Sequence, residues 1–398
     1  MTTRAAALYT IARVKPPSVL VVAGEASGDG HGADVVRAMK AKRPELAFFG
    51  MGGPKLEAAG LEVIHGAHEI SVMGIAEVLP KIPRILRVLG DLERTAKERR
   101  PAVALLIDVP DFNLRLAERL KALGIPVVYF VAPMIWAWRE GRARRIGRLV
   151  DELCCILPFE EPFLRERGVN ATYVGSPVLD QVPPVNEPAH FRRALGLDES
   201  RPVLAVLPGS RRSEIARLGA LMREVARAEA EAHPGLQVVV PVAPGLPKAL
   251  VSAAFEGVEV TLIDGRAPEV VGACDVGLVA SGTATLEAGL MRRPFVTIYR
   301  VSPLTYAVGK ALVRIPFFCL VNLLAKKRVV PELLQGDVTV PKVMAELEAL
   351  WSGPAREACL SGLDEVRASL GATGAAARVA ERVLARLVEA PAKEVAGS

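Results

Sequence analysis

The sequence predicts an α/β protein with two doubly wound parallel-sheet domains, and three observations lead to this prediction. Short apolar runs without polar alternation, such as residues 103–107, recur along the chain and are typical of strands buried on both faces. Glycine-containing turns and helical patterns follow several of these runs. The pattern begins again at residues 203–207, after a proline-rich stretch at 181–188, and the 398 residues exceed one typical domain.

The first domain is predicted to extend from residue 1 to 182. Its strands are expected at the apolar runs 18–24, 46–50, 103–107, 125–131, 153–157 and 171–175. A glycine-rich turn at 24–32 is expected to lead from the first strand into a helix at 33–42. Residues 70–89 carry apolar side chains at helical spacing, but Pro80 and Pro83 interrupt the pattern, so a single straight helix is not expected.

The second domain is predicted to extend from residue 183 to 350. Its strands are expected at the apolar runs 203–207, 237–242, 258–263, 276–280 and 295–299. Two amphipathic helices follow Pro354, and we expect residues 351–398 to hold these helices, packed back on the first domain, and a tail. Two such domains would face each other across a cleft, which is a common place for a ligand.

The composition argues against several classes of protein. No apolar run reaches the ~18 residues that a membrane-spanning helix needs, and residues 1–17 lack a convincing signal-peptide core. The five cysteines show no metal-ligand spacing, so we expect reduced thiols in a cytoplasmic protein and no metal site. The net charge of +6 includes basic clusters beside apolar segments, among them Lys81, Arg84 and Arg87. Such clusters favour an anionic lipid surface or anionic substrates over nucleic acid.

The glycine-rich turn matches a dinucleotide-binding fingerprint only loosely. Gly28, Gly30 and Ala33 have its spacing, but the match begins well after the strand has ended. The second strand also lacks the acidic residue that would hold a ribose. We therefore expect no nicotinamide cofactor, and we regard Glu25 and Ser27 in this turn as candidate substrate contacts.

Asp108 directly follows the apolar run 103–107, at the carboxyl end of the predicted strand. Open α/β sheets bind their ligands at that edge, where a carboxylate is poorly placed for packing and well placed for chemistry. We therefore favour a functional role for Asp108. Asp111 and Asn113 follow closely, and the alternative for either of them is to cap the next helix.

Trp136 and Arg139 follow the strand expected at 125–131 in the same way. Tryptophan stacks well on sugar rings, and arginine binds phosphates. Both residues are therefore candidate substrate contacts, and the alternative is a turn that belongs to the core.

Two strands of the second domain lead into small polar residues that open a helix. These residues are Ser210 and Arg211 after the run 203–207, and Ser281, Gly282 and Thr283 after the run 276–280. Backbone donors, the helix dipole and a guanidinium group together form an anion-binding cradle. Glu287 lies about one and a half turns into the second of these helices and is expected to face the same cleft.

Seven motifs, in order along residues 19–388, resemble the lipid-A-disaccharide synthase family of GT-B glycosyltransferases. They are GEASGD at 24–29, VMGIAEV at 72–78, IDVPDFN at 107–113, WAWR at 136–139, LPGSRR at 207–212, ASGTATLE at 280–287 and PELLQ at 331–335. The resemblance implies a GT-B fold, in which two Rossmann-like domains face a cleft. The chain departs from the family pattern at Ser176, where the family often has histidine, and at Val321 and Lys326, where it usually has proline and glycine.

The resemblance also implies roles for individual residues. Asp108 would be the catalytic base, with Glu25 and Asn322 as further catalytic residues. The substrate-binding residues would be Ser27, Asp111, Trp136 and Arg139. The UDP-binding residues would be Ser210, Arg211, Ser281, Gly282, Thr283 and Glu287, with Arg211 on the phosphates.

The implied reaction joins UDP-2,3-diacylglucosamine to 2,3-diacylglucosamine 1-phosphate (lipid X). It inverts the anomeric carbon, needs no cofactor, and gives a β-1,6 disaccharide 1-phosphate and UDP. Because both substrates carry acyl chains, we expect a peripheral protein on the cytoplasmic face of the anionic inner membrane, with residues 70–89 against lipid or acyl chains. The family precedent suggests a homodimer.

Three alternative functions stay open at this point. The chain could be another GT-B enzyme that acts on a different lipid-linked acceptor, a UDP-sugar epimerase of the same fold, or a non-catalytic nucleotide-sugar binder. Release of UDP with and without the monosaccharide acceptor distinguishes them.

Overall fold

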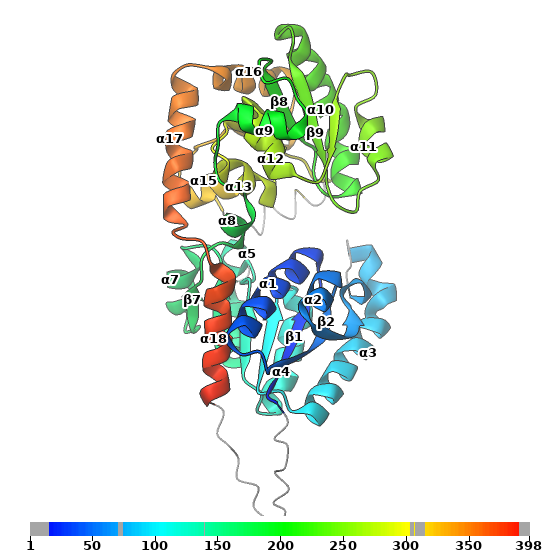
Figure 1. Ribbon diagram of the computed structural model, residues 1–398, viewed down its shortest axis with the longest axis vertical. Coiled ribbons are helices and arrows are strands. Elements are labelled where there is room, and N and C mark those ends of the chain that lie inside the picture. The colour runs from blue at the N-terminus through cyan, green and yellow to red at the C-terminus, as the bar shows by residue number, and fades with distance from the viewer. Residues whose placement is uncertain (1–15, 71–74, 139, 303–305, 307–314, 390–398) are drawn as a thin grey trace, which may run out of the picture.

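The computed structural model describes residues 16–70, 75–138, 140–302, 306 and 315–389. Its two lobes each consist of a parallel β-sheet covered by helices, and the chain crosses between the lobes twice (Figure 1). The first crossing includes α8 (Pro177–Gln181), and the second joins α17 (Pro354–Ser369) to α18 (Ala375–Glu389). This architecture confirms the predicted α/β class with two doubly wound sheets.

The first sheet has the strand order β3-β2-β1-β4-β5-β6-β7. Its strands are β1 (Ser18–Ala23), β2 (Ala47–Gly52), β3 (Leu61–Gly66), β4 (Val103–Ile107), β5 (Val127–Phe130), β6 (Glu152–Cys155) and β7 (Ala171–Tyr173). The adjacent strands β1 and β4 pair in parallel at the centre, and β4 is buried along its whole length. Because the strand order reverses between β1 and β4, the loops that follow these two strands diverge and leave a crevice.

The helices of the first lobe cover both faces of this sheet. They are α1 (Ala26–Lys42), α2 (Pro54–Ala59), α3 (Ile75–Arg99), α4 (Pro110–Ala122), α5 (Ile135–Trp138), α6 (Ala143–Leu149) and α7 (Glu160–Arg165), with the 3-10 turns η1 (Ala67–Glu69) and η2 (Glu140–Arg142). Each face has its own hydrophobic core, one with α3 and α4 and the other with α1 and α18.

The second sheet has the strand order β10-β9-β8-β11-β12-β13. Its strands are β8 (Val203–Leu207), β9 (Gln237–Val242), β10 (Thr261–Asp264), β11 (Val276–Ala280), β12 (Phe295–Tyr299) and β13 (Glu332–Leu334). Its helices are α9 (Pro188–Leu195), α10 (Arg212–Ala232), α11 (Lys248–Ala254), α12 (Ala267–Ala273), α13 (Thr283–Leu290), α15 (Leu320–Ala325) and α16 (Val340–Trp351), with the 3-10 turn η3 (Gln335–Asp337). The order reverses between β8 and β11, so the two predicted anion cradles lie at this switch point.

Helix α1 begins earlier than the sequence predicted. The helix includes Gly28, Gly30 and Gly32, which were expected to form a flexible turn before a helix at 33–42. A Cβ atom on Gly32 would lie 2.9 Å from Ile107 Cδ1 and 3.1 Å from Leu56 Cδ1. This glycine therefore allows α1 to approach the strand that ends at Asp108.

Helix α3 runs through both Pro80 and Pro83, so the expectation that these prolines interrupt the segment is wrong. Each proline removes only one backbone donor from a helix of 25 residues. Val88, Leu89 and Leu92, farther along the helix, are almost completely buried in the core of the first lobe. This burial holds the helix where the isolated sequence pattern favours a break.

The two C-terminal helices pack on different lobes, which corrects the expectation that the whole region packs on the first domain. Cys359, Leu363 and Val366 of α17 belong to the core of the second lobe. Val379 and Val383 of α18 belong to the core of the first lobe, where α18 lies against α1 (Figure 1). The apolar faces of both helices were visible in the sequence, but the surfaces that they cover were not.

A set of hydrogen bonds fastens the two interlobe crossings to each other. The carboxylate of Asp180, at the end of α8, accepts bonds from the backbone N–H groups of Gly374 (2.6 Å) and Ala375 (2.9 Å). The guanidinium of Arg378 donates to the carbonyl oxygens of Val174 (2.7 Å) and Ala372 (2.9 Å). We call this set the interlobe clasp.

Two alanine substitutions in α1 test the close approach of this helix to the sheet. Gly30→Ala places its Cβ only near the flexible Lys55 side chain, at 3.5 Å from Nζ, so it should keep or raise stability by up to about 1 kcal/mol. Gly32→Ala gains the same helix propensity but crowds Ile107 and Leu56, so its free energy of unfolding should be about 1–3 kcal/mol below that of Gly30→Ala. Urea denaturation measures both values. Equal stability of the two variants would contradict the packing role of Gly32.

Candidate functional site

Asp108 lies directly after β4, beside the switch point of the first sheet. The backbone of Asp108 and Val109 is left-handed, with φ angles of +52° and +44°. This conformation is unusual for any side chain and most of all for β-branched valine, and it costs about 1–3 kcal/mol per residue. Such strain persists only where the surrounding structure enforces it, and it is common at functional sites.

Two buried side chains hold the strained turn. The Nδ2 atom of Asn113 donates to the carbonyl oxygens of Ile107 (3.1 Å) and Asp108 (2.8 Å), and the hydroxyl of Tyr129 also donates to the carbonyl of Asp108. Burial raises the pKa of Tyr129 well above its ordinary value, so the phenol keeps the proton that it donates. Asn113 therefore supports the turn, and neither it nor Asp111 caps α4 through its side chain.

The charge of Asp108 acts on the carboxylate of Glu25. Burial raises the pKa of Asp108. The pKa of Glu25, which precedes α1, is raised first by burial and then by the negative charge of Asp108, and it is lowered by the charge of Arg211. Arg211 belongs to the second lobe, so a charge of that lobe acts on Glu25 in the first.

An apolar cavity of about 330 Å³ opens beside Glu25 in the first lobe. Helix α3 contributes Ile82, Ile85, Leu86 and Leu89 to its wall, and α4 contributes Phe112, Asp111 and Arg115. The cavity thus combines an aliphatic wall with charged groups, which suits a molecule that is part hydrocarbon and part polar.

Trp136 lies on α5 and is fixed by a buried carboxylate. Its Nε1 atom donates to Glu160 Oε1 at 3.0 Å, and its ring packs edge-on against Phe159. Glu160 is 1% exposed and accepts further bonds from the N–H groups of Ile156 and Leu157. Burial raises the pKa of Glu160 to about 7. This anchor orders the segment that the sequence proposed for substrate contact.

The other predicted first-lobe residues are less closely grouped. Asp111 lines the apolar cavity and forms an ion pair of 2.9 Å with Arg142. Ser27 is exposed in the first turn of α1. Arg139 lies outside the described residues.

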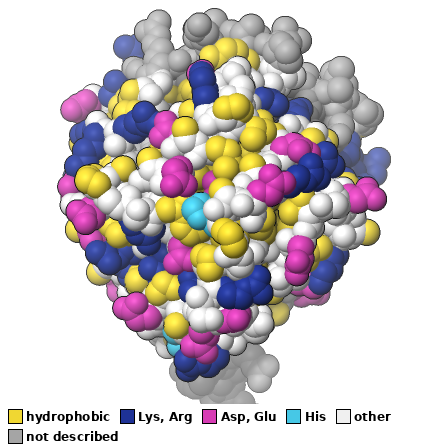
Figure 2. All heavy atoms as spheres, turned by 90° about the horizontal axis from the view of Figure 1, so that it is seen from above, with side chains coloured by type: hydrophobic (Ala, Val, Ile, Leu, Met, Phe, Trp, Pro, Cys, Tyr) yellow, Lys and Arg dark blue, Asp and Glu magenta, His cyan; other side chains and the backbone are white. Residues whose placement is uncertain are grey.

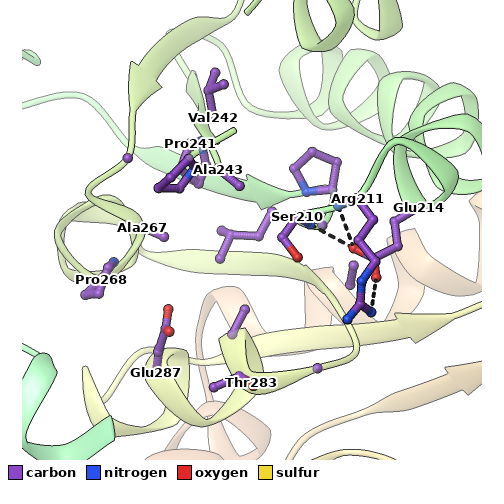
Figure 3. Close-up of a pocket in the computed structure, with 18 of the residues that line it drawn as sticks. Ser210, Arg211, Glu214, Pro241, Val242, Ala243, Ala267, Pro268, Thr283 and Glu287 are labelled. Atoms are coloured by element: carbon purple, nitrogen blue, oxygen red, sulfur yellow. Dashed lines mark hydrogen bonds and ion pairs between the residues drawn. The ribbon is translucent and has the colours of Figure 1, made fainter. Parts of the chain in front are cut away.

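A second cavity, of about 480 Å³, lies at the switch point of the second sheet. The residues predicted to bind UDP all line it, namely Ser210, Arg211, Ser281, Gly282, Thr283 and Glu287. In Figure 3, Glu287 lies on one side of this cavity, while Ser210, Arg211 and Glu214 lie together on another. Burial raises the pKa of Glu287. The end of β9 completes the wall with Pro241 and Val242, and the start of α12 with Ala267 and Pro268.

The backbone donors at the start of α10 are not free for an anion, which corrects the sequence interpretation. The N–H groups of Ser210 and Arg211 donate to Glu214 Oε2 at 2.8 and 3.2 Å, and the Arg211 guanidinium lies 3.3 Å from Glu214 Oε1 (Figure 3). At the start of α13, by contrast, the N-cap residue is Gly282, which has no side chain to cap the backbone donors. The cradle therefore consists of the amino end of α13, the Ser210 hydroxyl and Arg211.

Asn322 is completely buried on α15, and its amide is used inside the protein. Its oxygen accepts bonds from the N–H groups of Val329 (2.8 Å) and Val330 (2.9 Å), and its nitrogen donates to Val330 O and Glu332 Oε2. Glu332 in turn accepts from the backbone N–H of Phe318, whose carbonyl oxygen accepts from Ser281. The structure thus connects Asn322 to the second-lobe cavity indirectly and does not bring it together with Asp108.

Comparison with known families identifies the chain. The family described as lipid-A-disaccharide synthetase matches residues 19–361. The chain belongs to the lipid-A-disaccharide synthase family. The synthase of Myxococcus xanthus (strain DK1622) is 58% identical over 372 residues, which cover 93% of this chain and 97% of that protein. The synthase of Geobacter metallireducens is 41% identical with the same coverage.

Solved structures show the fold of this lipid-A-disaccharide synthase family member. The calicheamicin glycosyltransferase superposes with a TM-score of 0.60 at 15% identity, covering 94% of this chain and 100% of that one. The UDP-GlcNAc 2-epimerase of Neisseria meningitidis superposes with a TM-score of 0.58 at 12% identity, with the same coverage. These likenesses confirm the GT-B fold, and the family match over residues 19–361 confirms the family resemblance found in the sequence.

The described residues contain no group of three or more His, Cys, Asp or Glu side chains suited to hold a metal ion. None of their helices is both long enough and apolar enough to span a membrane.

Glu160→Gln tests the buried anchor of Trp136 through the pH dependence of stability. Because burial raises the pKa of Glu160 from 4.5 to about 7, the folded protein holds a proton that the unfolded chain has released between these values. Folding therefore loses stability as the pH rises through this window. Relative to Glu160→Gln, the free energy of unfolding of the wild type should fall by about 1.4 kcal/mol per pH unit from about pH 5 to 7 and then level off. Urea denaturation across this range measures it, and a constant difference would contradict the assignment.

Proposed function

We propose that this chain joins UDP-2,3-diacylglucosamine to 2,3-diacylglucosamine 1-phosphate, giving the β-1,6 disaccharide 1-phosphate and UDP. The observation that carries the proposal is membership of the lipid-A-disaccharide synthase family. The two cavities support it, because one combines Arg211 with the amino end of a helix and the other is apolar and opens beside Glu25. The charge of Arg211 also lowers the pKa of Glu25 from the other lobe.

Asp108 is the general base in this proposal. The 6-hydroxyl oxygen of the acceptor attacks the anomeric carbon of the donor while the bond from that carbon to the UDP oxygen breaks. The hydroxyl proton passes to the Asp108 carboxylate, and the single in-line displacement inverts the anomeric carbon. Burial raises the pKa of Asp108, which makes its carboxylate a stronger base than that of an ordinary aspartate. Glu25 lines the apolar cavity of the same lobe.

Arg211 and the amino end of α13 stabilise the departing UDP. The leaving diphosphate gathers negative charge, which a guanidinium group and uncapped backbone N–H groups neutralise. Glu214 holds the loop and the Arg211 side chain in place from the other side. Glu287 is available as an acceptor for hydroxyl groups of the nucleotide, and Asn322 serves as a positioning residue for the neighbouring loop.

Asp108→Asn should keep the fold and the affinity for UDP but lower turnover by at least about 10²-fold, because it removes the base and keeps the shape. The measurement is UDP release from the diacylated donor with and without the monosaccharide acceptor. Asp34→Asn, which changes an exposed carboxylate of α1 that lines neither cavity, is the matched control. Near wild-type turnover of Asp108→Asn would show that Asp108 is not the general base. UDP release without acceptor, or none with it, would contradict the proposed function itself.

We further propose that α3 meets an anionic membrane surface. Ile82 and Leu86 are 39% and 45% exposed although they also line the apolar cavity, and Arg84 and Arg87 lie exposed beside them. Each basic residue near an anionic surface contributes about 1 kcal/mol, an effect that salt screens. An acyl chain could therefore move between a bilayer and the cavity along α3.

Replacing Lys81, Arg84 and Arg87 by Glu should release the protein from anionic liposomes at low salt in a co-sedimentation assay. Activity on short-chain substrates in detergent should survive, because Asp108 and Arg211 are unchanged. The control replaces Arg201, Arg217 and Lys248 of the second lobe by Glu, which reverses the same number of charges. The end of that lobe mixes basic, acidic and apolar side chains (Figure 2), so this control should still pellet. If the triple α3 variant pellets like wild type, α3 does not bind the membrane and forms only the wall of the acyl pocket.

A further inference from the structure

The charged residues of α4 are paired with neighbouring elements, with one exception. Asp111 pairs with Arg142, Glu118 with Arg145, Arg119 with Glu93, and Lys121 with Asp151. Arg115 is exposed and has no ion pair within the part of the chain that the structure describes. It is also the only basic residue among the described residues that line the apolar cavity. An unpaired guanidinium at an aliphatic cavity points to a ligand that is both acylated and anionic.

We propose that Arg115 binds the 1-phosphate of the acyl-sugar acceptor and so selects the phosphorylated acceptor over its phosphate-free form. The inference rests on the proposed function, which supplies the class of acceptor. In that acceptor the phosphate is on C1, next to the acyl-bearing C2 of the same ring. When the acyl chains enter the cavity between α3 and α4, the phosphate must therefore stay at the cavity, where Arg115 lies.

The diphosphate of the donor is the other anion that could compete for Arg115, but a separate cradle is available for it. The cradle at Ser210, Arg211 and Gly282 lies in the second lobe. Asp111, which sequence analysis proposed as a substrate contact, is already neutralised by Arg142 at 2.9 Å. It therefore repels an incoming phosphate less than a free carboxylate would. Of the charged residues that line this cavity, Glu25, Asp111 and Arg115, only Arg115 can attract a phosphate.

The test compares 2,3-diacylglucosamine 1-phosphate with phosphate-free 2,3-diacylglucosamine, both in neutral detergent micelles. Arg115→Gln should raise KM and Kd for the phosphorylated acceptor by about tenfold, as for the loss of one exposed charge-assisted hydrogen bond. It should leave kcat within about twofold of wild type and leave the phosphate-free acceptor unaffected. Arg115→Lys should restore most of the affinity, because it keeps the charge. Lys97→Gln, which removes one exposed charge from α3 away from the cavity, is the control and should behave as wild type.

Three results would overturn the assignment. Equal losses for both acceptors would mean that Arg115 acts on the shape of the cavity. A loss seen in anionic vesicles and absent in neutral micelles would mean that the guanidinium binds lipid headgroups. Unchanged Kd for the phosphorylated acceptor would exclude the contact. The Kd measurements decide the inference even if wild type releases no UDP with either acceptor, a result that would contradict only the proposed function.

Discussion

The left-handed turn at Asp108 and Val109 is the constraint on which the site of the first lobe depends. A strand buried on both faces offers a polar side chain only at its end, and this turn places Asp108 there. Asn113 and Tyr129 hold the turn through its carbonyl groups. Gly24 makes room for it, because a Cβ atom at that position would lie 2.9 Å from Val109 Cγ2 and 2.7 Å from Ile70 Cδ1. Residues at the ends of β1, β4 and β5 thus together fix the position of the Asp108 carboxylate.

The two lobes contribute cavities of different chemical character. The second-lobe cavity is formed where β8 and β11 lead into helices, and it combines Arg211, Ser210 and the uncapped start of α13. The first-lobe cavity lies between α3 and α4 and is largely aliphatic. A polar anion and an acyl chain need different surroundings, so the two cavities suit chemically different parts of the substrates.

Much of this arrangement could be predicted from sequence, because its signals are local. An apolar run followed by Asp108, or by the Ser210–Arg211 and Ser281–Thr283 turns, identifies a buried parallel strand and its carboxyl end without knowledge of the rest of the chain. The edge strands β3 and β13 were missed because β3 is partly exposed and β13 has only three residues. The early start of α1 was missed because glycine normally disfavours a helix, and only the contact with Ile107 explains its presence there.

The site residues that sequence reasoning misjudged depend on partners far away or on competition for the same donors. Glu214 occupies the N–H groups of Ser210 and Arg211, and its spacing after Arg211 is that of a helix capping box, a signal that was available in the sequence. Asn322 matches a family motif, but its partners Val329, Val330 and Glu332 come from a turn that the sequence does not place beside it. Glu160 is recognisable only once the structure shows its burial against Trp136.

The charges of the two lobes are complementary, and this makes the interlobe clasp part of the chemistry. Burial raises the pKa of Asp108 and that of Glu25, and the charge of Asp108 raises the pKa of Glu25 further. The opposing influence on Glu25 comes from Arg211 in the other lobe, and its strength falls with distance. The position of Arg211 relative to Glu25 depends on the two crossings between the lobes, which Asp180 and Arg378 fasten together. The interlobe clasp therefore contributes to the charge balance at Glu25 without touching its carboxylate.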